Sequence, residues 1–207
     1  MTMMIQRRNL VAITISVFIT FIAGLVPAGG ADGTTIQGFI GVPHARDNAN
    51  VVVYIEKIPG NTFSPPVTPV RLNQANLTFT PHVLPVMVGT RVVFPNGDDT
   101  RHNVFSPTAG SKFDLGSYPR GSSKTHVFDK PGLVTLLCNV HAEMSAHILV
   151  TETPYFATTD KSGYFAIPSV PPGKYVLKTW HENSKPERVE IEVRAGESLT
   201  VPFELRK

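Results

Sequence analysis

Prolines are spread through almost the whole of this chain, and they restrict its fold more than any other feature of the sequence. Seventeen of the 18 prolines lie after residue 31. A proline inside a helix removes a backbone hydrogen bond and clashes with the preceding turn, so long helices are excluded from this part of the chain. Because 42% of the 207 residues are apolar, including 12 phenylalanines, the chain can still bury a core. We therefore expect an all-β fold.

The first 31 residues have the features of a secretory signal peptide. Arg7 and Arg8 form a short cationic region, residues 10–26 are apolar and almost uncharged, and the small residues 28–31 follow. We expect this N-terminal signal helix to be removed and the protein to be exported to the periplasm, with no membrane span after cleavage. The alternative is a retained anchor, because 17 apolar positions reach the lower limit of a membrane span.

The balance of charge after cleavage argues against nucleic acid as a partner. Without Arg7 and Arg8, 17 basic side chains stand against 16 acidic ones. Binding to nucleic acid depends on an excess of positive charge. We therefore expect no nucleic-acid partner.

The single cysteine is informative because the expected export would place it in an oxidising compartment. Cys138 has no second cysteine in the chain with which to form a disulfide. An unpaired thiol in an oxidising compartment is a liability unless it is buried or bound. A bound metal ion is the obvious candidate.

Short β-rich runs follow one another at close spacing, a pattern typical of sandwiches and barrels. The expected strands cover residues 36–42, 51–58, 77–80, 91–94, 125–128, 133–137, 147–151, 164–167, 174–180, 188–193 and 199–205. The run 188–193 alternates strictly between polar and apolar residues, which predicts a strand with one solvent-exposed face.

Metal-binding side chains gather around the cysteine. Cys138, His141 and Met144 follow a strand at intervals of three residues, and His102 lies thirty-six residues upstream of the cysteine. A tight loop would direct the first three toward one point, with His102 arriving from a neighbouring strand end. A thiolate, two imidazoles and a thioether select copper, because zinc has little use for a thioether. Two alternatives remain: a buried apolar thiol without a metal, and Glu143 in place of Met144 as an oxygen ligand.

At these residues the sequence resembles the cupredoxins, especially the plastocyanin and amicyanin group, over about residues 70–151. The matching segments are Val92-Val93-Phe94-Pro95-Asn96, His102-Asn103-Val104 and Phe128-Asp129-Lys130-Pro131-Gly132.

The resemblance implies a Greek-key β-sandwich holding one copper ion that alternates between Cu(I) and Cu(II). It implies His102, Cys138 and His141 as equatorial ligands and Met144 as the axial ligand. It also implies that Asn103 clamps the ligand loop by a hydrogen bond near Asn139. The short Cys-x-x-His-x-x-Met spacing looks like amicyanin, whereas the family usually has proline where this chain has Val140.

The C-terminal part resembles a different family, the carboxypeptidase regulatory-like domains, which are small transthyretin-type β-sandwiches. The resemblance rests on Asp160-Lys161-Ser162-Gly163-Tyr164-Phe165 and on Val170-Pro171-Pro172-Gly173-Lys174-Tyr175. We expect residues 32–62 to supply the first strands of this sandwich and 152–207 the remainder, with the cupredoxin domain, 63–151, inserted between them. The alternative is a tandem in which the early strands belong to the cupredoxin. The whole chain resembles exported plastocyanin-like proteins labelled methylamine utilisation proteins.

These features predict a periplasmic one-electron carrier whose partner is a redox protein such as a cytochrome or a dehydrogenase. We expect the ring edge of His141 to be the electron port, with Val140, Ala142 and Pro107 as an apolar docking rim. An enzyme is not expected, because the sequence has no second metal set, no Ser-His-Asp arrangement and no His-Glu-x-x-His motif. His82, His147 and the other histidines are not in His-x-His pairs, and we expect His147 to face solvent. The alternatives are a copper-binding or delivery protein and a structural β-sandwich with a vestigial site.

Overall fold

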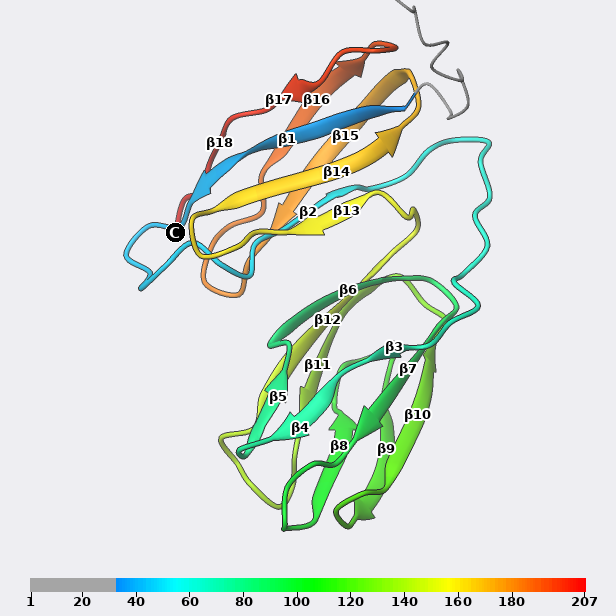
Figure 1. The fold of residues 1–207 in the computed structure, drawn as a ribbon, viewed down its shortest axis with the longest axis vertical. Coiled ribbons are helices and arrows are strands. Elements are labelled where there is room, and N and C mark those ends of the chain that lie inside the picture. Colours follow the sequence, from blue (N-terminus) through cyan, green and yellow to red (C-terminus); the bar gives the residue numbers. More distant parts are fainter. Residues whose placement is uncertain (1–32) are drawn as a thin grey trace, which may run out of the picture. The chain divides into compact units, whose positions relative to one another are not determined.

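The computed structural model describes residues 33–207, and in this range the protein consists of β-strands without a helix (Figure 1). The expected all-β fold is confirmed. The signal helix expected in residues 1–31 lies outside the described residues. No helix in the described part is long and apolar enough to cross a membrane.

Two sheets enclose the first hydrophobic core. The larger sheet has the strand order β6-β12-β11-β8-β9 and the smaller one the order β10-β7-β3. The strands of the larger sheet are β6 (Val83–Met87), β12 (Ser145–Thr151), β11 (Gly132–Leu137), β8 (His102–Ser106) and β9 (Phe113–Tyr118). Those of the smaller sheet are β10 (Ser123–Phe128), β7 (Thr90–Pro95) and β3 (Val70–Arg71), and a short hairpin adds β4 (Asn73–Ala75) and β5 (Thr78–Thr80).

Alternation along the strands explains why these sheets pack face to face. In β7 the residues Thr90, Val92 and Phe94 are buried, and the residues between them are more exposed. Successive side chains of a strand point to opposite faces, so one face of β7 enters the core. There Phe94 packs in one cluster with Phe79, Leu136 and Ile148.

The second core lies between two further sheets. One sheet has the order β14-β1-β17, with β18 also paired to β1, and the other has the order β13-β2-β15-β16. Their strands are β14 (Tyr164–Val170), β1 (Thr34–Gly41), β17 (Leu199–Thr200), β18 (Phe203–Glu204), β13 (Phe156–Thr158), β2 (Val52–Ile55), β15 (Gly173–Trp180) and β16 (Arg188–Val193). Early strands therefore pair with late ones, since β1 runs antiparallel to β14 and β2 antiparallel to β15.

Two connections position the candidate ligands. Strands β11 and β12 form an antiparallel pair in which Leu137 lies opposite Ser145, so residues 138–144 form the loop between them. The chain between β7 and β8, residues 96–101, crosses from the smaller sheet to the larger one and delivers His102 as the first residue of β8. Asn96 anchors this crossover, because its side chain donates to the carbonyls of Thr100 and Tyr118 and accepts from the amide of Asp98.

The strands missed by the sequence analysis include β6. Its Pro85 argues against a strand because proline cannot donate to a ladder. The strand forms nevertheless because β6 lies at the edge of its sheet and needs to pair only with β12.

Candidate metal centre

The loop 138–144 folds back on itself. The backbone N–H of Cys138 donates to the carbonyl of Met144 at 3.2 Å, and the N–H of Met144 donates to the carbonyl of His141 at 3.1 Å. The two ends of the loop are thus held together, and the extended conformation that would separate its donor residues is excluded.

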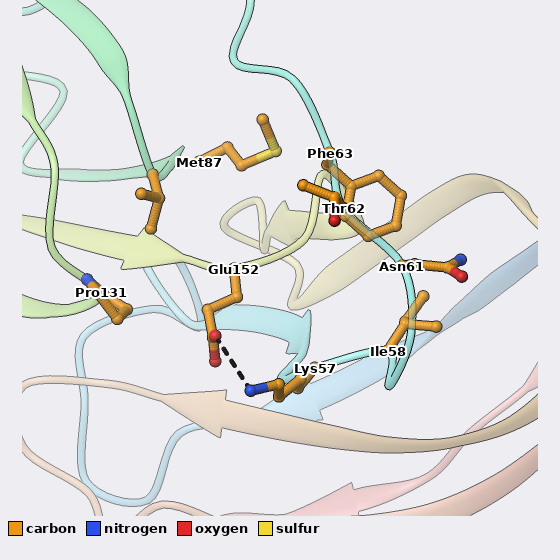
Figure 2. A pocket seen from close by; sticks show the side chains of 9 residues that line it. Lys57, Ile58, Asn61, Thr62, Phe63, Met87, Pro131 and Glu152 are labelled. Carbon is orange, nitrogen blue, oxygen red and sulfur yellow. Dashed lines mark ion pairs between the residues drawn. The ribbon is translucent and has the colours of Figure 1, made fainter.

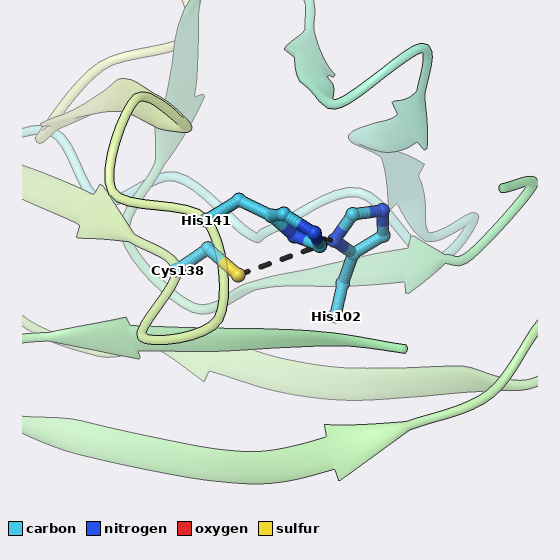
Figure 3. Close-up of side chains that lie close together, drawn as sticks. All are labelled: His102, Cys138 and His141. Atoms are coloured by element: carbon cyan, nitrogen blue, oxygen red, sulfur yellow. Dashed lines mark hydrogen bonds between the residues drawn. The ribbon is translucent and has the colours of Figure 1, made fainter. Parts of the chain in front are cut away.

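Three donor atoms converge beside this loop. Nδ1 of His102 lies 3.1 Å from Nδ1 of His141 and 4.0 Å from Sγ of Cys138. All three atoms lie within 4.8 Å of one another. Figure 3 shows the Cys138 and His141 side chains coming from one loop, with the ring of His102 approaching from another segment.

Asp98 fixes the orientation and the tautomer of His102. Oδ2 of Asp98 lies 2.8 Å from Nε2 of His102 and can only accept a hydrogen bond there when ionised. Nε2 of a neutral His102 ring therefore carries the proton, and Nδ1 presents a lone pair toward His141 and Cys138. A carboxylate on the far nitrogen is the usual support of a metal-binding histidine.

Asp98 is itself held in place by the turn between β4 and β5. Its Oδ1 accepts from the backbone N–H of Asn76 at 2.6 Å, and its Oδ2 accepts from that of Leu77 at 2.9 Å. Burial acts to raise the pKa of Asp98, but the hydrogen bonds from Leu77, His102 and Asn76 outweigh it and lower the pKa below its usual value. The carboxylate is thus kept ionised beside the His102 ring.

Cys138 lies in an apolar, almost closed environment. Its residue surface is 4% exposed, and it belongs to the first hydrophobic core. The backbone N–H of Asn103 donates to its Sγ at 3.5 Å. A donor of this kind stabilises the negative charge of a thiolate.

The side chain of Asn103 forms its hydrogen bond with a different residue from the one predicted near Asn139. Nδ2 of Asn103 donates to Oδ1 of Asp114 at 2.6 Å, and Asn139 is exposed. Asn103 Oδ1 is buried without a hydrogen-bond partner. Asp114 on β9 lies within reach because β9 pairs with β8. The connection between Asn103 and the ligand loop is its main-chain bond to Cys138.

Met144 and Glu143 lie in opposite surroundings. Met144 is 1% exposed and packs in the same core as Cys138, whereas Glu143 is exposed. The group of converging His, Cys and carboxylate atoms contains His102, Cys138 and His141 without Glu143. This placement favours Met144 over Glu143 as the fourth candidate ligand.

The solvent side of the site is formed by the loop. His102 is fully buried, His141 is partly buried, and Val140 and Ala142 on either side of it are exposed. Pro107 follows the opposite end of β8 from His102, so this residue does not belong to a rim around His141.

The donor set fits one transition-metal ion. Nitrogen and sulfur donors bind such ions at about 2.0 to 2.3 Å, so two donors of one ion lie at most about 4 to 4.5 Å apart. The separations of 3.1 Å and 4.0 Å fall within this limit. An ion bound between the rings would take the place of any hydrogen bond between the two Nδ1 atoms.

Sequence reasoning missed two features. It gave Asp98 no part in the site, whereas the carboxylate contacts His102; the interval of four residues between them was the available signal. It also missed a second group of possible ligands, His82, His147 and Glu182. The expectation that His147 faces solvent is wrong, because its side chain is only 15% exposed.

A separate pocket of about 270 Å³ contains none of the predicted ligands (Figure 2). Its ionisable side chains, Lys57 and Glu152, form an ion pair with each other at 3.6 Å.

A comparison with protein families matches residues 142–206 to the carboxypeptidase regulatory-like domain, which confirms the resemblance of the C-terminal part. The match begins in the ligand loop and includes β12, a strand that pairs with β11 and β6. No curated protein matches the sequence.

The solved structures that resemble the chain include cupredoxins, as the sequence resemblance indicated. A purple cupredoxin from Nitrosopumilus maritimus is 22% identical, with a TM-score of 0.36, over 40% of this chain and 99% of the other. Amicyanin from Paracoccus versutus is 18% identical, with a TM-score of 0.38, over 41% and 83%. A copper-containing nitrite reductase from Thermus scotoductus is 26% identical, with a TM-score of 0.40, over 48% of this chain but only 25% of the reductase.

Proposed function

We propose that this protein is an exported type 1 copper protein that carries single electrons between redox partners. The observation that carries the proposal is the convergence of two imidazole Nδ1 atoms and one buried thiol sulfur within 4.8 Å of one another. The thiol and the nearby buried Met144 favour copper over zinc, because soft sulfur donors with imidazole select copper.

The ion would supply the exchange of one electron between Cu(I) and Cu(II). The surrounding residues would hold the donors still while the charge changes. Asp98 orients His102, the Asn103 amide supports the thiolate, and backbone bonds close the 138–144 loop. Because the donors need not rearrange, the barrier to electron transfer stays low.

The exposed edge of the site supports a role for His141 as the electron port. His102 is buried, while His141 is partly accessible and lies beside Val140, which is 47% exposed. A partner such as a cytochrome or a dehydrogenase would approach over this loop. A small apolar contact area suits a partner that must dissociate after each transfer.

The test is to add Cu(II) to the purified protein and to record the visible absorption spectrum. We expect an intense thiolate-to-copper charge-transfer band at one equivalent of copper. Cys138→Ser should abolish the band, and Glu143→Gln should retain it because Glu143 is exposed. A protein that stays colourless with Cu(II) contradicts the proposal.

A second measurement separates an electron carrier from a copper-delivery protein. A carrier keeps its copper through repeated cycles of oxidation and reduction, whereas a delivery protein releases the ion to a chelator in one oxidation state. We expect the protein to retain its copper and its band over many cycles. Rapid loss of Cu(I) to a competing chelator would favour delivery.

We also propose that residues 32–62 and 152–207 form one sandwich into which the copper domain, 63–151, is inserted. The pairing of β1 with β14 and of β2 with β15 supports this division. Trp180, the only tryptophan, lies in β15 and reports on the second sandwich and on its contact with Val83 and Leu149. In denaturant, Ile36→Ala should lower the midpoint reported by Trp180 fluorescence more than the midpoint reported by the copper band. The opposite ranking would favour the tandem arrangement.

A further inference from the structure

His82 and His147 are held side by side by the backbone. The N–H of His147 donates to the carbonyl of His82 at 2.8 Å, where β6 begins to pair with β12. Their rings lie edge to face, with centroids 5.4 Å apart. Because both residues belong to paired segments of one sheet, their relative position is fixed by main-chain bonds.

This pair lies on the opposite face of β12 from the copper candidate. Along β12, Ala146 and Ile148 enter the first core, while His147 and Leu149 alternate with them. Leu149 packs instead in a separate cluster with Val52 and Val83. The two histidines are therefore distinct from the site formed by His102, Cys138 and His141.

One nitrogen of each ring has an oxygen partner on the same sheet. Nδ1 of His82 lies 3.2 Å from the carbonyl oxygen of Ser145, and Nδ1 of His147 lies 3.5 Å from Oγ1 of Thr135. A carbonyl only accepts, so Nδ1 of His82 carries a proton. When that ring is neutral, its Nε2 is an acceptor with a lone pair.

Both Nε2 atoms face the same carboxylate oxygen. Oε2 of Glu182 lies 3.1 Å from Nε2 of His82 and 3.5 Å from Nε2 of His147. The donor atoms of the three residues lie within 4.8 Å of one another. Histidines with one nitrogen bonded to a protein oxygen and the other facing a shared point match the arrangement around bound metals.

The two rings and the carboxylate surround one point. Without an ion, Glu182 accepts a hydrogen bond from Nε2 of His82 only when that nitrogen carries a proton. A divalent ion would displace this proton and bind to the two rings and the carboxylate together.

We propose that His82, His147 and Glu182 form a second metal site, for a divalent transition-metal ion of the Zn²⁺ type. Two imidazoles and one carboxylate are ligands that zinc accepts, with a solvent molecule completing the set. The side chains are 32%, 15% and 35% exposed, so an ion can enter from solvent. Without sulfur, this site has no preference for Cu(I).

A bound ion would join segments that are far apart in sequence. Glu182 follows β15 and is 100 positions from His82. Trp180 packs against the cluster of Val52, Val83 and Leu149, and its ring centroid lies 5.2 Å from that of His147. Metal binding should therefore stabilise the contact between β15 and the β6 and β12 pair.

The test is calorimetric titration of the copper-loaded protein with Zn²⁺. We expect one equivalent of Zn²⁺ to bind while the visible copper band is unchanged, and the melting temperature to rise with Zn²⁺ concentration. Glu182→Gln should weaken binding at least tenfold, and Glu197→Gln, the same change at an exposed glutamate outside the cluster, should not. Equal binding by both variants, or Zn²⁺ uptake only with loss of the copper band, would overturn the proposal.

A measurement on the unsubstituted protein avoids any effect of substitution on folding. In long-range ¹H–¹⁵N spectra of the imidazole rings, Zn²⁺ should shift Nε2 of His82 and His147 and leave their Nδ1 atoms much less affected. Shifts confined to His102 and His141 would contradict the site. The spectra are recorded on the reduced protein, because paramagnetic Cu(II) broadens the signals of nearby rings. The copper band is recorded after reoxidation of the same sample, so the outcome is independent of the proposed electron transfer.

Discussion

Oδ2 of Asp98 accepts a hydrogen bond from Nε2 of His102 at 2.8 Å, and this contact decides which nitrogen of the ring faces Cys138. The same carboxylate accepts from the amides of Asn76 and Leu77, so the β4–β5 turn is linked through Asp98 to the candidate ligand. The geometry of the candidate metal centre therefore depends on a segment that contributes none of the candidate ligands.

Asp98→Asn should weaken copper binding by about 10- to 100-fold, the usual effect of removing a carboxylate that supports a metal-binding histidine. An amide is a weaker acceptor than a carboxylate and can present its NH₂ group to the ring, which favours the wrong tautomer. Affinity is measured by competition with a chelator of known copper affinity. Asp99→Asn is the matched control, because the side chain of Asp99 is 86% exposed and pairs with Arg120. Equal affinities for the two variants would show that the contact does not support the site.

Met144→Leu should raise the reduction potential of the copper while leaving the fold almost unchanged. Without the axial donor the ion would have only three ligands in an apolar site, and this low coordination number favours Cu(I) over Cu(II). Leucine and methionine are similar in volume, and the swap should cost less than about 1.5 kcal/mol of unfolding free energy. Met87→Leu is the control, since Met87 is also buried but lies in β6 outside the metal centre. If voltammetry gives the same potential for both variants, Met144 is not a ligand.

The sequence predicts a strand and its buried face where polar and apolar residues alternate along the chain. The alternation in 188–193 predicts one wet face, and Val189 and Ile191 do pack against the second core while Arg188, Glu190 and Glu192 are exposed. The strand β6 was missed because Pro85 is acceptable only at a sheet edge, and no local pattern says which strand lies at the edge.

The candidate metal sites also differ in how far the local sequence could predict them. Cys138, His141 and Met144 lie in one loop, so their spacing along the chain was informative. Their assignment as ligands with His102 stays a prediction, although three of the donor atoms converge. The second group could not be predicted, because Glu182 meets His82 only through the packing of distant strands.

Gly163→Ala should destabilise the protein more than Gly110→Ala. Both glycines have positive φ, 89° at Gly163 and 80° at Gly110, a conformation that costs alanine about 1–2 kcal/mol. At Gly163 an added Cβ would also overlap the carbonyl oxygen of Ile40, whereas at Gly110 it meets nothing. The overlap should add at least about 1 kcal/mol. Unfolding in urea measures both losses, and equal losses would mean that the turn before β14 moves freely away from β1.

His126 should make the protein less stable as the pH falls below neutrality. Its ring stacks on Phe113 with centroids 3.9 Å apart and lies 4.9 Å from that of Phe128. Burial lowers the pKa of His126, and Asp129 opposes this only in part. The unfolded chain then binds the proton more readily, so the stabilisation is present above about pH 6.5 and is lost as the pH falls through the folded-state pKa.

His126→Phe keeps an aromatic ring and removes the titration of His126. The free energy of unfolding should therefore fall less for the variant than for the unsubstituted protein between about pH 7.5 and pH 5. The comparison cancels the contributions of all other histidines, and an identical decrease in both proteins would show that the ring of His126 is as easily protonated in the folded state as in the unfolded chain.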